Sequence, residues 1–273
     1  MGGAQYPAPM DAAPDWLELC RRAAAKAAAA IGRHPDRWQE VGRGGGGDMT
    51  LAIDRAAEDA VFAELEELEG GVRAISEERG EVDVNGGGLL RVVIDPVDGS
   101  RNARRDLPLY ALSLAVAEGP AMSDVTFAYV HDFGRGEHWW AHRGGGAFLE
   151  GKPLLAARGD ELELLGLEST HPAELAGAAG GFAAAGPDRL RALGSVALSL
   201  CYVAAGSLDA MLTLSATRSV DAAAGQLLVR EAGGSVAFPE AGDLAAPLTL
   251  DMRSRVLAAS GPLGLERLRD AFG

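Results

Sequence analysis

The chain has 273 residues, enough for one large domain or two modest ones, and its composition of 48% hydrophobic and 23% charged residues is typical of a globular protein. Asp and Glu number 39 against 25 Lys and Arg, so the formal net charge is −14. This charge argues against a general nucleic-acid binder and against binding to an anionic membrane surface. Two cysteines cannot build a disulfide framework or a zinc site, and no secretory signal is visible, so we expect a reducing, cytoplasmic location.

The first half predicts two helices followed by a run of strands. Helices are expected over residues 14–31 and 53–68, separated by a glycine tract at residues 42–47 that we expect to form a loop. Apolar runs then predict strands over residues 72–75, 90–94, 109–117, 124–130 and 137–141. Turn signals follow at residues 144–146 and 151–153.

The second half alternates between strand-like and helical segments. Strands are expected over residues 162–167 and 210–214, near residue 236, and over residues 256–259. Helices are expected over residues 195–205, 220–232 and 263–272. We therefore expect an α+β or α/β fold of stacked layers, with an N-terminal half (residues 1–155) and a C-terminal half (residues 156–273) that form one compact catalytic unit.

The hexapeptide DPVDGS at residues 95–100 carries the densest chemical signal. It places Asp95 and Asp98 directly after a buried strand, in what we expect to be a stiff, Pro-containing turn. Two carboxylates held so close repel each other unless one is protonated or a cation lies between them. Carboxylate oxygens suit Mg²⁺, and paired ions suit phosphoryl chemistry. An acidic turn at a strand end, without any ion, is the alternative for the hexapeptide alone.

Acidic residues occupy comparable places in three other segments. Glu77 follows an apolar strand, and Asp221 begins an alanine-rich helix whose small residues allow close packing beneath a site. Asp48 and Asp54 lie between the glycine tract and the second helix.

These segments resemble the inositol monophosphatase family of magnesium-dependent, lithium-sensitive sugar-phosphate phosphatases. The family pattern is a Glu-Glu element, then Asp-Pro-(Ile/Leu/Val)-Asp-Gly-(Thr/Ser)-X-Asn, then Asp-X-Ala-(Ala/Gly)-Gly. All three occur in order, at residues 77–78, 95–102 and 221–225, and further similar segments lie at residues 107–113, 146–154 and 194–204. The similarity covers about residues 15 to 265 and is greatest to the archaeal-type branch, in which inositol monophosphatase and fructose-1,6-bisphosphatase activities often coexist. The resemblance implies the layered α-β-α-β-α sandwich of these sugar phosphatases.

The resemblance also implies a set of metal ligands. Glu77 and Asp95 would bind a first Mg²⁺ together with the backbone carbonyl of Val97. Asp95, Asp98 and Asp221 would bind a second ion. Two of these ligands, Asp95 and Asp98, come from the same hexapeptide.

Three further residues are implied to support the metal site and the attacking water. Asp48 resembles a loop carboxylate that helps to bind a third, weaker ion; its alternative is an ordinary exposed loop residue. Asp54 and Ser100 correspond to a pair that orients and deprotonates the water, and Glu77 is counted with them as catalytic. The alternative role for Asp54 is to cap the second helix.

Substrate contacts are implied at three places. Backbone N–H groups of Gly99 and Ser100 would hold the phosphate, at the start of what we expect to be a helix. Gly194 and Ser195 begin a similar segment and are candidate substrate-binding residues. Arg218 either contacts the substrate phosphate or is a solvated loop cation.

The expected reaction is hydrolysis of a small phosphorylated polyol or sugar by direct attack of a metal-activated water, with inositol-1-phosphate and fructose-1,6-bisphosphate as leading substrates. Residues 212–216 lack the acidic residue with which inositol-specific members bind ring hydroxyls, which weakens the inositol assignment. A 3′-phosphonucleotide and a secondary-metabolism intermediate are alternative substrates. A non-catalytic regulatory protein on the same fold is the alternative outside enzymes, and a two-metal nuclease is disfavoured because no basic groove is evident. The family commonly forms homodimers, so a homodimer without nucleic-acid or membrane partners is expected.

Overall fold

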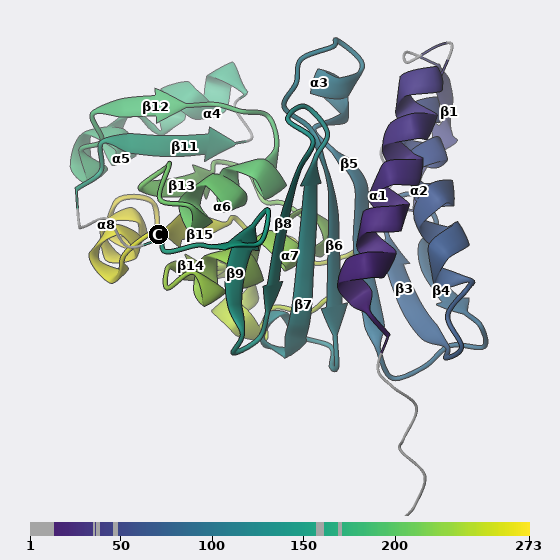
Figure 1. Cartoon of the computed structure of the whole chain (residues 1–273). Coiled ribbons are helices and arrows are strands. Elements are labelled where there is room, and N and C mark those ends of the chain that lie inside the picture. Colours follow the sequence, from purple (N-terminus) through teal and green to yellow (C-terminus); the bar gives the residue numbers. More distant parts are fainter. Residues whose placement is uncertain (1–13, 35, 37–38, 46–48, 157–160, 169–170) are drawn as a thin grey trace, which may run out of the picture.

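The computed structural model describes residues 14–34, 36, 39–45, 49–156, 161–168 and 171–273. Within them, three layers of helices alternate with two large β-sheets (Figure 1). One apolar cluster joins the first sheet to the outer helix layer, a second joins it to the central helices, and a third joins the second sheet to the helices beyond it. The predicted α-β-α-β-α sandwich is therefore confirmed.

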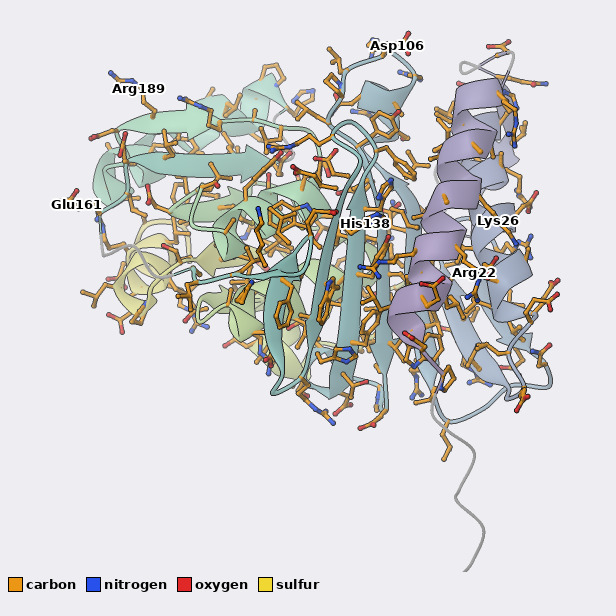
Figure 2. The ribbon with its side chains drawn as sticks, viewed as in Figure 1. Arg22, Lys26, Asp106, His138, Glu161 and Arg189 are labelled. Carbon is orange, nitrogen blue, oxygen red and sulfur yellow. The ribbon has the colours of Figure 1, made fainter. Side chains whose placement is uncertain are left out.

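The outer layer consists of two helices, α1 (Trp16–Arg33) and α2 (Ala52–Leu65). Glu64 of α2 binds both Arg22 and Lys26 of α1, at 2.8 and 2.5 Å, and these two side chains project from α1 in Figure 2. The second helix ends three residues earlier than predicted. The side-chain amide of Asn85 donates to carbonyls just beyond the helix end, including that of Leu68 at 2.8 Å, and so stabilises the termination.

The first sheet has eight strands in the order β10-β9-β8-β7-β6-β5-β3-β4. All neighbours are antiparallel except β3 and β5. The strands are β3 (Val72–Ser76), β4 (Gly80–Val84), β5 (Arg91–Asp98), β6 (Ala111–Ala117), β7 (Val125–Asp132), β8 (Glu137–His142), β9 (Gly146–Leu149) and β10 (Lys152–Pro153). The sequence predicted five of these; β4, β9 and β10 are short or lie among glycines.

The glycine tract does not form only a loop, contrary to the prediction. Its first residue, Gly42, lies in β1 (Glu40–Arg43), which pairs with β2 (Met49–Leu51) across an irregular register. Gly42 has φ of +137°, a conformation that glycine adopts without steric cost, so the strand tolerates it. Residues 46–48 of the tract region lie outside the described residues.

β5 contains the irregularity that builds the site. The sequence predicted a turn after residue 94, but the strand continues to Asp98 with a shift in register between Asp95 and Asp98. Pro96 lies within this shift, where the missing N–H removes one ladder hydrogen bond. In a regular strand, side chains three residues apart point to opposite faces. Here Val97 packs with residues of α1 and α2, while Asp95 and Asp98 both line the cleft described below.

The central layer consists of α6 (Val196–Ala204) and α7 (Ser219–Glu231), which lie between the two sheets (Figure 1). The two helices are in close contact because a glycine faces a leucine: a Cβ on Gly225 would come within 2.5 Å of the Leu200 side chain. This confirms the expectation that small residues allow α7 to pack closely.

The second sheet has the order β12-β11-β13-β15-β14. Its strands are β11 (Leu164–Glu168), β12 (Arg189–Arg191), β13 (Ala210–Thr213), β14 (Ser235–Ala237) and β15 (Leu257–Ala259). β11 is parallel to both of its neighbours, and the other pairs are antiparallel. The last layer is formed by α4 (Pro172–Gly177), α5 (Ala179–Ala185) and α8 (Pro262–Phe272). Two 3₁₀ turns, Pro239–Ala241 and Asp243–Ala245, precede β15, and a third, Met122–Asp124, precedes β7.

The chain passes from the first sheet to the second between β10 and β11, which brackets the division expected at residues 155 and 156. That division stays a prediction. Across the described ranges, no helix combines the length and apolar character needed to cross a bilayer.

Candidate active site

A cleft of about 490 Å³ opens where the end of β5 meets the start of α7. Its wall also includes the short helix α3 (Ser100–Ala103), which follows β5 directly (Figure 1). The lining residues carry four carboxylates and three guanidinium groups. The acids are Glu77, Asp95, Asp98 and Asp221, and the arginines are Arg101, Arg218 and Arg253. The four acids that the sequence singled out as metal ligands therefore lie at one place.

Each acid is positioned by the end of a secondary-structure element. Glu77 follows β3, and its N–H donates to the Ile94 carbonyl of the neighbouring strand at 3.2 Å. Asp95 accepts a hydrogen bond from the Val97 N–H at 3.0 Å, which fixes the bulge of β5. Asp221 lies in the first turn of α7 and accepts from the Arg218 N–H at 2.8 Å. Three separate elements thus deliver their carboxylates to the same cleft.

The electrostatics of these acids favour a bound cation. Burial raises the pKa of Glu77 to about 7 and that of Asp98 to about 8, and the charge of Asp221 raises both further. Burial and the nearby charge of Glu77 raise the pKa of Asp95 well above its usual range. The carboxyl groups of Glu77 and Asp95 lie close enough to share a hydrogen bond. Such mutual repulsion is what a bound cation relieves.

Arg218 supplies positive charge among these acids. Its Nη2 forms an ion pair with Oε1 of Glu77, and its Nε lies 3.9 Å from Oδ1 of Asp221. The side chains of Arg218 and Glu77 are only 14% and 18% exposed, so the pair is largely sheltered from water. The alternative of a solvated loop cation is therefore wrong for Arg218; its guanidinium contacts two candidate metal ligands.

Asp98 is held by the start of α6. Its Oδ2 accepts hydrogen bonds from the Ser195 hydroxyl and the Ala197 N–H, both at 2.6 Å. Ser195 also caps α6, because its Oγ accepts from the Leu198 N–H at 3.2 Å. Ser195 is buried and Gly194 lines the cleft, so the segment predicted to bind substrate lies beside a candidate metal ligand.

The donor set fits a hard divalent cation. Four carboxylates, with the Val97 carbonyl in the same cleft wall, are the oxygen ligands that Mg²⁺ prefers. As the side chains stand, however, no group of three or more His, Cys, Asp or Glu in the described part of the chain is already arranged to hold a metal ion. Two of the four carboxylates already have partners, since Glu77 is paired with Arg218 and Asp98 accepts from the Ser195 hydroxyl. Binding of a metal ion therefore requires local movement of these side chains.

The two residues of the predicted water-activating pair lie in different surroundings. Asp54 is buried in the first turn of α2, where its Oδ2 accepts from the Leu51 N–H at 2.9 Å. Asp54 thus serves the helix start as the alternative reading suggested, although from inside the helix rather than at its N-cap, which is Leu51. Ser100 lines the cleft, whereas Asp54 is not among the lining residues, so their partnership stays a prediction. Burial raises the pKa of Asp54 to about 8, with the charge of Glu78 contributing. Asp48 lies outside the described residues.

Gly99 and Ser100, the predicted phosphate contacts, both line the cleft. Gly99 adopts a φ of +89°, and a Cβ there would lie 2.8 Å from the Leu109 carbonyl oxygen, so only glycine fits this turn. The helix that follows has only four residues, too short to add much of a dipole. The predicted phosphate contacts would therefore depend on individual N–H groups.

Sequence reasoning missed residues that shape or line the cleft. Glu168, at the end of β11, is buried and accepts from the N–H groups of Leu193 and Gly194 at 3.1 and 2.8 Å, which holds the loop before α6. Its place after an apolar strand was an available signal. Arg101 fills the variable position of the central motif and could have been noticed, whereas Arg253 lies in no motif and carried no local signal.

Asn102, the last residue of the central motif, has a positioning role. Its side-chain amide donates to the carbonyls of Leu109 and Leu193, both at 2.8 Å. It thereby joins α3 to the start of β6 and to the loop before α6.

Comparison with known proteins agrees with this geometry. The profile of the inositol monophosphatase family matches residues 15–272. A fructose-1,6-bisphosphatase/inositol-1-monophosphatase of Methanothermobacter thermautotrophicus is 36% identical over 234 residues, covering 82% of this chain and 83% of the relative. The Nus factor SuhB of Escherichia coli is 34% identical, with 81% and 84% covered. The structure of the extragenic suppressor protein SuhB from Bartonella henselae superposes with a TM-score of 0.78 at 26% identity, over 94% of this chain and 97% of that one.

The fold, the cleft and these matches define a phosphatase of the sugar-phosphate type. The chain belongs to the inositol monophosphatase family. The resemblance to its archaeal-type members, stated from the motifs, is confirmed by relatives of that kind.

Proposed function

We propose that the protein is a Mg²⁺-dependent phosphomonoesterase of a small phosphorylated polyol or sugar. The observation that carries this proposal is the meeting of Glu77, Asp95, Asp98 and Asp221 at one cleft. Their carboxylates would hold two Mg²⁺ ions together with the Val97 carbonyl, and Asp48 would help to bind a third. A bound Mg²⁺ neutralises ester oxygens, lowers the pKa of a coordinated water and stabilises the leaving alkoxide.

The side chains have separate tasks in this scheme. Glu77 and Asp95 would lose the proton of the hydrogen bond between them and bind the metal as carboxylates. Asp54 and Ser100 would orient the attacking water and accept its proton, which requires the buried carboxylate of Asp54 to be ionised. The N–H groups of Gly99 and Ser100 would hold the phosphate in line. The reaction would proceed by direct attack of water, without a phosphoenzyme.

The second half of the chain would bind the rest of the substrate. Gly194 and Ser195 lie beside Asp98, in a loop that Glu168 fixes. Arg218 would contact the phosphate once it leaves Glu77. Ala216 lines the cleft in the segment that lacks an acidic residue, so no carboxylate there is available for ring hydroxyls. This favours a sugar phosphate such as fructose-1,6-bisphosphate over inositol-1-phosphate as the substrate. The 3′-phosphonucleotides are an alternative substrate class and are included in the assay below.

A screen for phosphate release tests the proposal. Purified protein with Mg²⁺ is assayed against phosphorylated sugars, inositol phosphates and 3′-phosphonucleotides, with Asp95→Asn as the control that removes the shared ligand. We expect release from at least one sugar or polyol phosphate, lost in EDTA and in the variant. Absence of release from every compound at any Mg²⁺ concentration would refute the proposal.

The similarity to a protein named Nus factor SuhB favours a second candidate, a regulatory protein that binds transcription machinery through the same fold. Recovery of a macromolecular partner by a protein without phosphatase activity would support it. Against it, the candidate ligand set is complete. A homodimer and a cytoplasmic location are part of the first proposal, and analytical ultracentrifugation tests the former.

A further inference from the structure

Two arginines of the cleft come from opposite halves of the chain. Arg101 lies on α3, immediately after Ser100, and is exposed. Arg253 is also exposed and lies in the segment before β15. A bridge next to it fixes its place: Thr217 and Ser254 exchange backbone hydrogen bonds of 2.8 and 3.2 Å. This bridge brings Arg253 beside the segment that carries Arg218.

Backbone carbonyls hold the guanidinium of Arg253. Its Nη1 donates to the carbonyls of Leu250 and Met252, at 2.5 and 2.8 Å. Within the described ranges, no group accepts a hydrogen bond from its Nε or Nη2. Part of the fork is therefore anchored, and the rest remains available to a ligand in the cleft.

The charges of these two arginines are not neutralised by the protein. Arg218 is paired with Glu77, but neither Arg101 nor Arg253 forms an ion pair with any residue that the structure describes. They stay unpaired among these residues although acids outnumber basic residues in this chain of net charge −14. Two positive charges on the wall of one cleft favour an anionic ligand there.

We propose that Arg101 and Arg253 form a second anion-binding subsite, which binds an anionic group of the substrate other than the phosphate that is hydrolysed. This inference rests on the proposed function. Two Mg²⁺ ions would balance the four carboxylates, so the three guanidiniums would remain to meet the substrate. Their three positive charges exceed the two negative charges of one phosphomonoester. A second anionic group on the substrate would neutralise the remaining positive charge.

The chemistry of a guanidinium selects the class of that group. Its planar fork binds phosphate and carboxylate oxygens through paired, charge-assisted hydrogen bonds. The substrate is therefore a sugar bisphosphate or a phosphorylated sugar acid, rather than a polyol with a single phosphate. Arg101 and Arg253 act as specificity residues and take no part in the bond that breaks.

A matched substrate series tests the subsite. Glucose 1-phosphate, glucose 1,6-bisphosphate and glucuronic acid 1-phosphate differ only at C6, which carries a hydroxyl, a phosphate or a carboxylate. Fructose 1-phosphate and fructose 1,6-bisphosphate form a second pair, and inositol 1-phosphate and inositol 1,4-bisphosphate a third. For each set, kcat/KM for hydrolysis with Mg²⁺ is measured and expressed as the ratio of the doubly anionic compound to its monophosphate.

The variants are Arg101→Gln, Arg253→Gln, the double variant, and Arg253→Lys to restore charge. Arg189→Gln is the matched control, because it removes the same charge and because the Arg189 guanidinium, which projects outward from β12 (Figure 2), hydrogen-bonds among the described residues to the carbonyl of its neighbour Asp188 alone. Thermal unfolding of each variant shows whether it is folded.

In the wild type we expect a ratio of about ten or more in at least one set, which corresponds to about 1.4 kcal/mol. The double variant brings the ratio close to one through a higher KM for the doubly anionic compound, Arg253→Lys restores part of it, and Arg189→Gln leaves it unchanged. If the monophosphates are hydrolysed and the ratio is near one in the wild type, or is unchanged in the folded double variant, the subsite is wrong while the proposed function stands. If no compound in any set is hydrolysed, the proposed function fails and the subsite fails with it. Comparison of the C6 phosphate with the C6 carboxylate decides which anion the subsite binds.

Discussion

Replacing Arg218 with Gln should tighten Mg²⁺ binding, although it removes a cleft residue. The guanidinium forms an ion pair with Glu77 and lies 3.9 Å from Asp221, and both carboxylates are candidate ligands. A cation can bind them only if this contact is broken. The variant keeps the backbone N–H of residue 218, which donates to Asp221 at 2.8 Å, so the start of α7 is retained.

The structure sets the size of the effect. With side-chain exposures of 14% and 18%, the Arg218–Glu77 pair is neither a surface pair nor fully buried. A hydrogen bond to a charged group contributes about 1.5–3 kcal/mol, and about 1.4 kcal/mol is tenfold in an equilibrium constant. We therefore expect the Kd for Mg²⁺ to fall by roughly 10- to 100-fold in Arg218→Gln. The metal-free variant should unfold at a lower temperature, because Glu77 and Asp221 are left without that positive charge.

Calorimetric titration with Mg²⁺ measures the Kd, and thermal unfolding with EDTA or Mg²⁺ measures stability. Arg255→Gln is the matched control, since Arg255 forms a 2.6 Å ion pair with Glu240 away from the cleft lining. It should lower stability slightly and leave the Kd unchanged. An unchanged or weaker Mg²⁺ affinity in folded Arg218→Gln would refute the reasoning that the guanidinium competes with the cation.

Three other outcomes follow from the structure. Asp95→Asn should abolish turnover, because the charge of the ligand shared by both ions is gone. The melting temperature should stay near that of the wild type, because the amide oxygen still accepts from the Val97 N–H. Wild-type activity in this variant would contradict the site. The metal-free protein should be less stable at about pH 8.5 than at about pH 5. Glu77 and Asp98 have pKa values of about 7 and 8 in the folded state against about 4 in the unfolded state. The folded state therefore holds more protons, and the free energy of unfolding falls as the pH rises through that window. Saturating Mg²⁺ should remove this trend, and a melting temperature in EDTA that rises with pH would contradict it. Gly225→Ala should lower the free energy of unfolding by about 1–3 kcal/mol in chemical denaturation, because its Cβ would overlap the facing leucine of α6. Gly32→Ala in α1, which has open space around it, should raise the free energy of unfolding by about 0.5–1 kcal/mol. Equal effects of the two substitutions would contradict the packing.

Local pattern was sufficient to locate most of the elements. The apolar periodicity gave both outer helices, the central helices and the long strands of the first sheet to within a few residues, because these segments bury one continuous face. It missed β1 and β4, since short or glycine-containing strands are stabilised by their pairing partners more than by their own residues.

The candidate site divides in the same way. The acids at the ends of strands and at the start of α7 could be found because each stands at a recognisable boundary. The bulge of β5 could not be predicted, because the shift is defined by pairing with β6. The position of Arg253 in the cleft wall depends on a bridge between segments 37 residues apart. The burial of Asp54 depends on packing around α2. Such features are set by the whole fold and leave no trace in neighbouring residues.

The irregularity in β5 also limits how this chain can change in length. Deleting Val97 would leave the two aspartates two residues apart, on one face of a regular strand, but it would remove the N–H that fixes the Asp95 carboxylate and the side chain that packs against α1 and α2. An insertion in the surface turn between β8 and β9 would leave every cleft residue in place. Loss of residue 97 should therefore be rejected even where its substitution by other apolar residues is accepted.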